Sequence, residues 1–343
     1  MKKWLGLAAA SLTTLLTMTT VFVPAASAQA KHSNANFKVG LVTDVGGLND
    51  HSFNHLAYVG LEAAKAKYGV TVSVVQSHQS SDYFPNLSTY AQQGYNLVIA
   101  VGFLMDSAVQ KVAKEYPKTK FMIIDDAITG HPNVMSALFD TQQCGYLVGV
   151  MSGLMNKQKH IPQINGKNVI GLIGGMDIPP VTSYMAGFIA GVHKVNPKAK
   201  VLIDWTNSFT DPALGKEDAL SLISKGADII FPVAGGTGDG AIAAAKEKNV
   251  FAIGVDANQN YLAPKTVMTS ALKGVNTATE IAIGDALHNH FKAGLNFFDL
   301  KNQGVGFATP IVAVPKSVLK KVDSFIPLLN SGKIKPPSAL SSH

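Results

Sequence analysis

The sequence contains 343 residues, of which 47% are hydrophobic and 15% are charged. A chain of this length and composition can bury one large core or two cores of ordinary domain size, which excludes an intrinsically disordered protein. All 29 basic residues are lysine, and the formal net charge is +7. Because arginine is absent, and its planar fork is the usual bidentate partner of phosphate and carboxylate, the composition favours an uncharged ligand.

The first thirty residues (1–30) predict a secretory signal peptide. Lys2 and Lys3 precede an uncharged apolar run over residues 4–23, and small residues follow up to Ala30. This order matches the basic, apolar and small-residue regions of such a signal. The alternative is an uncleaved membrane anchor, because the apolar run approaches bilayer-spanning length. We therefore expect an exported protein, in the periplasm, at the cell surface or in the extracellular medium.

Cys144 is the only cysteine, so neither an intramolecular disulfide nor a multi-cysteine zinc site is available. No cysteine stands near the end of the apolar leader, so we expect membrane association through a partner rather than through a lipid anchor. The sequence has no nucleophile elbow and no zinc-hydrolase motif, and we expect no catalytic residue, no metal and no cofactor. Nucleic-acid binding is not expected either, because the lysines are scattered along solvated faces; a weak attraction to anionic surfaces is the alternative.

Short apolar runs alternate with helix-patterned segments after the leader, and the alternation occurs twice. The first series predicts strands at 38–43, 70–76, 97–101, 121–125 and 134–139, with helices at 53–68 and 106–116. The second predicts strands at 168–173, 200–204, 228–231 and 251–254, with helices at 180–192, 212–225 and 240–248. Alternation of this kind indicates an α/β protein with two lobes, each a parallel sheet covered by helices.

Ligands of open parallel sheets bind outside the carboxyl ends of the strands, so the residues there are the candidates. They are Asp44, Gly102 with Phe103, Asp106, Asp125 with Asp126, the turns at 174–180, 207–217 and 234–240, and Asp256. For each one the alternative is structural, since glycine serves turn geometry and aspartate caps helices. The glycine-rich turn 235–240 does not match a dinucleotide fingerprint, because its third glycine comes one residue early.

Phe53 and Phe209 are the most informative candidates in this set. Each follows a serine in a polar turn, where the sequence pattern offers an aromatic ring no core to fill. Such rings either cover the hydrophobic layer or, one from each lobe, sandwich a flat ligand.

Seven motifs follow one another along the chain: DVGGLNDHSFN, GFLMDSA, GLIGGMDIPP with YMAGFIAGV, SFTDPALGKEDAL, GADIIFPVAGGTGDG, IGVDANQ and TSALKGVN. Together they resemble the basic membrane protein family, the purine-nucleoside-receptor-like substrate-binding proteins of ABC importers. The resemblance extends from about Phe37 to Gly306.

The resemblance implies a type I periplasmic-binding-protein fold, with two Rossmann-like lobes joined by a hinge. We expect an N-terminal lobe at 36–140 plus 270–304, a C-terminal lobe at 141–269 plus 305–335, and a tail at 336–343. Hinge segments are expected near 139–143, 267–273 and 304–310. The implied function is that of a monomeric extracytoplasmic protein, not an enzyme, which captures a nucleoside, with purines favoured, and delivers it to ABC permease and ATPase subunits.

The resemblance also assigns five residues to the base of the nucleoside. Phe53 and Phe209 match the aromatics that stack on the base in the family. Asp44, Asn54 and Asp106 match positions that hydrogen-bond the base or help to orient it.

The ribose is assigned to three further residues, Gly235, Asp256 and Lys273. A ribose diol can donate two hydrogen bonds to one carboxylate such as Asp256, and Lys273 can donate to the ribose oxygens while neutralising that carboxylate. The phosphate of a nucleotide would be repelled by several aspartates, and the sequence has no arginine to pair with it. We therefore expect nucleotides to bind poorly. Asp50 is expected to cap the following helix.

Two positions depart from the family pattern: Gln143 replaces the usual glutamate, and KGVN at 273–276 replaces a more charged version. Either change could alter ligand choice or the contacts between the lobes. Two alternatives to a nucleoside importer component stay open, namely a sensory or regulatory relative with the same clamp and a receptor for a sugar or autoinducer. An uncleaved leader that serves as a membrane anchor would favour the sensory or regulatory relative. A receptor for a sugar or autoinducer is distinguished by whether Phe53 and Phe209 face each other across the cleft at stacking distance for a planar base.

Overall fold

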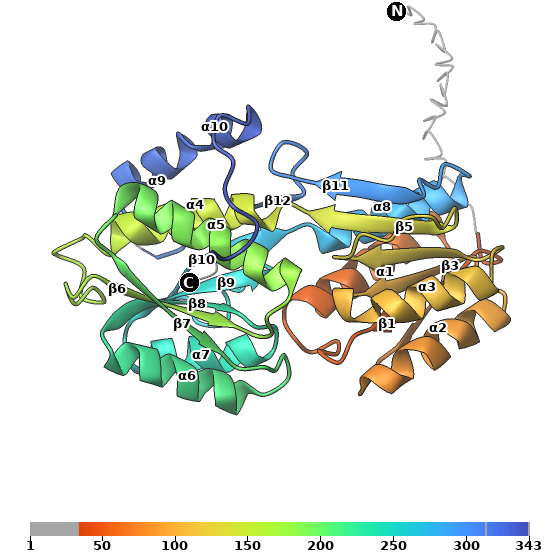
Figure 1. The fold of residues 1–343 in the computed structure, drawn as a ribbon, viewed down its shortest axis with the longest axis horizontal. Coiled ribbons are helices and arrows are strands. Elements are labelled where there is room, and N and C mark those ends of the chain that lie inside the picture. The colour runs from red at the N-terminus through yellow and green to blue at the C-terminus, as the bar shows by residue number, and fades with distance from the viewer. Residues whose placement is uncertain (1–33, 313, 342–343) are drawn as a thin grey trace, which may run out of the picture. The chain divides into compact units, whose positions relative to one another are not determined.

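The computed structural model describes residues 34–312 and 314–341 (Figure 1). The signal peptide predicted at 1–30 lies outside these residues. Within them, no helix is both long enough and apolar enough to cross a bilayer.

The first lobe is built on a parallel sheet with the strand order β11-β5-β4-β3-β1-β2. Its strands are β1 (Lys38–Thr43), β2 (Thr71–Val75), β3 (Leu97–Val101), β4 (Lys120–Ile124), β5 (Val134–Phe139) and β11 (Gly294–Phe298). Its helices are α1 (Phe53–Tyr68), α2 (Tyr83–Gln92), α3 (Asp106–Glu115) and α8 (Val275–Leu287). The central strands are apolar runs because both faces of the sheet are covered.

The second lobe repeats this plan with the order β12-β10-β9-β8-β6-β7, in which only β12 is antiparallel to its neighbour. Its strands are β6 (Val169–Gly174), β7 (Lys200–Trp205), β8 (Ala227–Val233), β9 (Phe251–Asp256), β10 (Val267–Lys273) and β12 (Val305–Phe307). Its helices are α4 (Thr141–Met155), α5 (Pro179–Val195), α6 (Pro212–Ser224), α7 (Thr237–Glu247), α9 (Lys316–Asp323) and α10 (Ile326–Asn330). The predicted α/β class with two parallel sheets is confirmed (Figure 1).

The chain passes between the two lobes three times: at residue 140, at residue 274 and in the loop 299–304. Strand β10 lies wholly in the second sheet, so the second crossing falls four residues after the predicted lobe boundary at 270. Strand β12 also lies in the second sheet, so the third crossing precedes it, and the hinge segment that we predicted at 304–310 is placed too far along the chain.

Gln143, at the start of α4, connects two of these crossings. Its Nε2 donates to Asp140 Oδ2 over 3.2 Å, and its Oε1 accepts from the backbone N–H of Leu300 over 2.8 Å. A glutamate here could still accept from Leu300 but could not donate to the Asp140 carboxylate. The departure from the family pattern therefore changes a contact at the crossings.

Helices α4 and α5 touch through glycines, which allow the two backbones to approach closely. A Cβ atom added to any of these glycines would overlap a backbone carbonyl oxygen of the opposite helix. The glycines are Gly145, Gly149 and Gly153 on α4, and Gly187 and Gly191 on α5. The spacing of four residues places each set on one helix face.

We predict that Gly149→Ala lowers the free energy of unfolding by about 1 to 3 kcal/mol, because its methyl group would overlap the Phe188 carbonyl and force the helices apart. Urea unfolding measures the loss. Gly306→Ala is the control, since a Cβ there meets nothing within 4 Å. Equal midpoints for the two variants would contradict the close helix contact.

Candidate functional site

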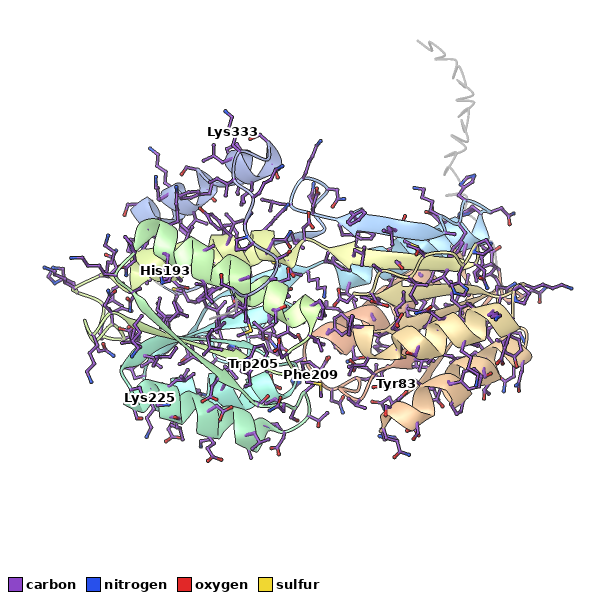
Figure 2. The ribbon with its side chains drawn as sticks, in the orientation of Figure 1. Tyr83, His193, Trp205, Phe209, Lys225 and Lys333 are labelled. Carbon is purple, nitrogen blue, oxygen red and sulfur yellow. The ribbon has the colours of Figure 1, made fainter. Side chains whose placement is uncertain are left out.

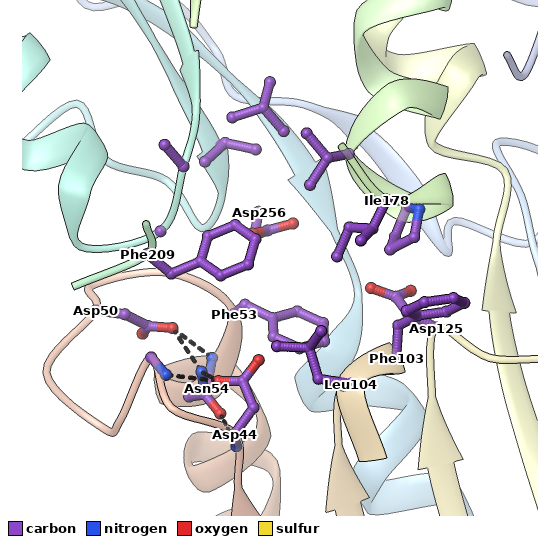
Figure 3. Close-up of a pocket in the computed structure, with 18 of the residues that line it drawn as sticks. Asp44, Asp50, Phe53, Asn54, Phe103, Leu104, Asp125, Ile178, Phe209 and Asp256 are labelled. Carbon is purple, nitrogen blue, oxygen red and sulfur yellow. Dashed lines mark hydrogen bonds between the residues drawn. The ribbon is translucent and has the colours of Figure 1, made fainter. Parts of the chain in front are cut away.

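A pocket lies where the carboxyl ends of the two sheets face each other (Figure 3). It holds about 600 Å³ of empty space, part of it open to solvent. Seven of the eight predicted ligand-binding residues line it: Asp44, Phe53, Asn54, Phe209, Gly235, Asp256 and Lys273. The eighth, Asp106, is not among the lining residues.

Asp106 is the first residue of α3, and its carboxylate is engaged by its neighbours. Nε2 of Gln110 donates to both of its oxygens, over 2.8 and 3.1 Å. Burial, together with a hydrogen bond to Asp106 and the charge of Asp106, raises the pKa of Asp126 to about 7. The two carboxyl groups therefore form a pair beside the pocket.

Asp44 is held by Asn54, whose side-chain amide makes all of its hydrogen bonds within the protein. Nδ2 of Asn54 donates to Asp44 Oδ1 over 2.8 Å and to Asp50 Oδ2 over 3.2 Å (Figure 3). Its Oδ1 accepts from the backbone N–H of Asp44 over 3.3 Å. Asn54 thus positions Asp44, whose second oxygen, Oδ2, accepts no hydrogen bond from the described residues and lies next to Gly102.

Asp50 caps helix α1, as the sequence predicts. Its carboxylate accepts the backbone N–H groups of Ser52, Asn54 and His55 over 3.0, 2.7 and 3.0 Å. These are donors that an uncapped helix start would leave unsatisfied. The cap fixes the first turn of α1, on which Phe53 and Asn54 stand.

Phe53 and Phe209 reach the pocket from opposite lobes. Phe53 begins α1, Phe209 lies in the loop between β7 and α6, and both rings point into the same space (Figure 3). Each ring rests against a glycine at the end of a strand. A Cβ on Gly102 would lie 3.4 Å from the Phe53 ring, and one on Gly175 would overlap the Phe209 ring. Gly102 also has φ +129°, which favours glycine.

Lys273 and Asp125 form an ion pair at the pocket, with side chains that are only 2% and 7% exposed. Nζ of Lys273 also lies over the rings of Phe53 and Phe139, at 4.6 and 5.1 Å from their centroids. Burial raises the pKa of Asp125, and the ammonium group of Lys273 opposes that rise. Lys273 ends β10 and Asp125 follows β4, so the pair joins the two lobes.

Asp256 ends β9 and is bonded from both lobes. The hydroxyl group of Tyr184, on α5, donates to its Oδ1 over 2.9 Å. Ser52, from the first lobe, has its Oγ 2.8 Å from Asp256 Oδ2 and 3.0 Å from the carbonyl oxygen of Val255, either of which can accept its proton. Tyr184 was not among the predicted site residues, and its only signal in the sequence was its place at the start of the motif YMAGFIAGV.

The loop before α1 makes further contacts with the second lobe through His51. Its Nδ1 lies 2.7 Å from Asp239 Oδ2, and its carbonyl oxygen accepts from Nε2 of Gln259 over 3.3 Å. Together with the Ser52 contact to Asp256, these bonds hold a first-lobe loop against the second lobe at the rim of the pocket.

The charges that line the pocket are mainly negative. Four carboxylates, those of Asp44, Asp50, Asp125 and Asp256, stand against the single ammonium group of Lys273. Burial raises the pKa of Asp44 to about 6, which still leaves it ionised at neutral pH. The site therefore offers hydrogen-bond acceptors in excess of donors and disfavours an anionic ligand.

Residues 37–332 match a family model described as ABC transporter substrate-binding protein, PnrA-like. The chain is 34% identical to a CD4+ T-cell-stimulating antigen of Listeria monocytogenes, with 89% of each chain covered. It is 33% identical to the ABC transporter nucleoside-binding protein BmpA of Lactococcus lactis, with 91% of this chain and 92% of BmpA covered.

Among solved structures, the chain is similar to an ABC transporter solute-binding protein of Aeropyrum pernix K1. The TM-score is 0.82 at 28% identity, and the match covers 89% of this chain and 94% of that one. The same architecture thus extends over nearly the whole of both proteins.

We predict that Asp44→Asn stabilises the ligand-free protein at pH 7.5 by about 1 to 3 kcal/mol. The folded pKa of about 6 exceeds the ordinary value of 3.8, so the charged form of Asp44 destabilises the folded state above pH 6. As the pH falls from 6 toward 3.8 the native carboxyl takes up its proton first, and the advantage of the variant fades.

Thermal unfolding between pH 4 and 8 measures this difference. Asp177→Asn is the control, because it removes the same charge from an exposed residue of the turn after β6. A destabilised Asp44→Asn protein at pH 7.5, or a gain that is equal at every pH, would contradict the burial of an ionised carboxylate.

Proposed function

Because this chain belongs to the PnrA-like family of ABC transporter substrate-binding proteins, we propose that it captures a nucleoside in the pocket between its lobes and passes it to an importer. Family membership makes the chain a substrate-binding protein rather than an enzyme, with permease and ATPase subunits as partners. The observation that carries the nucleoside assignment is the pair of aromatic rings, Phe53 and Phe209, which enter one pocket from opposite lobes.

The base is the part of the ligand that this pair would bind. Two aromatic faces can enclose a planar base, and stacking contributes about 1 to 3 kcal/mol per base. Oδ2 of Asp44 is free to accept an N–H group from the edge of the base, while Asn54 keeps the carboxylate in place. A purine has the larger stacking surface, and we infer a purine nucleoside as the preferred ligand.

The ribose would lie toward the second group of polar residues. Asp256 has two oxygens with remaining lone pairs, and each can accept a ribose hydroxyl. Among the described residues, Lys273 is the only lysine that lines the pocket, and it can donate to a ribose oxygen from its position over Phe53. Gly235, which has φ +52°, brings backbone close to the ligand without a side chain.

We further propose that the protein acts outside the cytoplasm as a monomer, directed there by the leader at 1–30. Capture would close the lobes about the three crossings, since binding-protein lobes move as rigid bodies about such segments. His51 and Ser52 of the first lobe contact the second lobe in this structure, and we propose that these contacts form when the lobes close.

We predict tight binding of guanosine, inosine or adenosine by protein that has been unfolded and refolded to remove carried-over ligand. Phe53→Ala and Phe209→Ala should each weaken binding by roughly 5- to 150-fold, the equivalent of one lost stacking face. Asp256→Asn should weaken it as well, because the amide offers one acceptor where the carboxylate offers two. Isothermal titration calorimetry measures all of these changes.

Phe297→Ala is the matched control, because this phenylalanine is 60% exposed on β11 and does not line the pocket. It should bind as the parent does. Binding of free ribose alone, or of no nucleoside, would refute the nucleoside assignment and favour a receptor for a sugar or a sensory relative.

Nucleoside monophosphates should bind at least about 100-fold more weakly than the matching nucleosides. A phosphate dianion would enter a pocket with four carboxylates and one ammonium group, which is already paired with Asp125. Titration of guanosine and guanosine monophosphate under identical buffer conditions tests this difference. Equal affinities would show that the phosphate stays outside the pocket or meets a cation that the lining residues do not supply.

A further inference from the structure

The two lobes carry opposite formal charges. First-lobe residues 34–140 and 274–304 contain 9 lysines and 12 aspartates and glutamates, a formal charge of −3. Second-lobe residues 141–273 and 305–343 contain 17 lysines and 10 aspartates and glutamates, a formal charge of +7. The basic character of the protein outside its leader therefore belongs to the second lobe alone.

Seven of the second-lobe lysines gather at the amino-terminal edge of the second sheet. They lie in the loops and helix ends that precede β6, β7 and β8. We call this set the lysine face: Lys157, Lys159, Lys167, Lys194, Lys198, Lys200 and Lys225, all exposed. Figure 2 labels Lys225 and His193, the residue before Lys194, at this end of the lobe.

The lysine face lacks nearby carboxylates that could neutralise it. None of its seven lysines forms an ion pair with the part of the chain that the structure describes. Asp228 lies behind the face but is buried, and its oxygens accept from Nδ2 of Asn156 and from the backbone N–H of Asn165. Burial and the charges of Asp204 and Glu217 raise the pKa of Asp218, on α6, and the ammonium group of Lys225 opposes that rise, so Lys225 is the lysine of the face that has a carboxylate near it. The positive charge therefore points outward.

The surface of the face is hollowed rather than flat. Lys157, Lys159 and Lys198 line a recess together with the side chains of Asn168 and Asn196. Ammonium groups are donors suited to phosphate oxygens, whereas Nδ2 of Asn196 already donates to Asn168 and Asn156. The large apolar side chains that are exposed among the described residues all lie outside segments 156–168 and 193–200. A partner would therefore be held by charge and hydrogen bonds, without apolar insertion.

We propose that the lysine face docks the protein on an anionic membrane surface, with lipid phosphates in and around the recess. Clusters of four to eight lysines are attracted to such surfaces, and the partner of a substrate-binding protein resides in a membrane. The negative first lobe is repelled by the same surface, so the second lobe faces it. The pocket opens at the carboxyl ends of the strands, the opposite edge of the sheet, and stays accessible to solvent.

Vesicle cosedimentation of the full chain tests the docking surface. The vesicles are phosphatidylcholine with or without phosphatidylglycerol, at low salt and at about 0.5 M NaCl, where surface charges are screened. The variant is Lys157→Gln with Lys159→Gln and Lys198→Gln. The matched control, with the same loss of charge in the first lobe, is Lys111→Gln with Lys114→Gln and Lys118→Gln. Because all of these proteins contain residues 1–33, any vesicle binding by that segment is common to them. Only the difference between the variants therefore measures binding by the lysine face.

We expect the recess variant to lose at least about tenfold in partition onto phosphatidylglycerol vesicles at low salt, and the control to change less than about twofold. High salt should abolish the difference. An equal loss in both variants would show an effect of net charge alone and overturn the proposed face. If the protein binds soluble polyphosphate but does not cosediment with vesicles, the membrane is not its partner and the proposal is wrong. Unchanged thermal unfolding of both variants confirms that folding is intact.

Discussion

The buried ion pair of Lys273 with Asp125 is the contact on which the pocket depends. Taking both charges out of water is costly, and the cost is offset only if the two groups stay together. Lys273 also lies over the rings of Phe53 and Phe139, so its ammonium group is held by π faces as well as by a carboxylate. Because one partner ends a strand of the second sheet and the other follows a strand of the first, the pair fixes the relation of the two strand ends at the pocket floor.

The cap on α1 fixes the side chains at the wall of the pocket, as the ion pair fixes the strand ends. Asp50 binds three backbone N–H groups, and Asn54 uses its amide to join Asp50 to Asp44. One short loop thereby sets the direction of Phe53, presents one free oxygen of Asp44 and places Ser52 against Asp256 of the other lobe. A residue that supports others in this way can be as necessary for binding as one that touches the ligand.

The fold was readable from the sequence wherever strands are buried on both faces. The nine predicted strands are present with bounds within two residues. Seven of them are covered parallel strands, which are plain apolar runs, whereas β2 and β7 are edge strands with half-buried or exposed residues. Among the elements that were not predicted, α8 has a buried face that includes small residues such as Ala278 and Ala282, and β11 is an exposed edge strand. The lobe boundary at residue 270 was also misplaced, since an apolar run such as β10 does not reveal which sheet it joins.

In the site, strand-end positions were predictable. The internal use of the Asn54 amide and the position of Asp106 beside the pocket were not, because both depend on neighbours distant in sequence.

The distribution of charge explains how a basic chain can contain an acidic pocket. Seven of the 17 lysines of the second lobe form the lysine face at the amino-terminal edge of its sheet, a full strand length from the carboxyl ends where Asp256 stands. Surface charges separated by more than about 10 Å are largely screened at physiological salt, so the lysine face does not cancel the pocket carboxylates. The lysine that does line the pocket is already paired with Asp125. The net charge of the chain therefore describes its outer surface, whereas the pocket has a local field of the opposite sign.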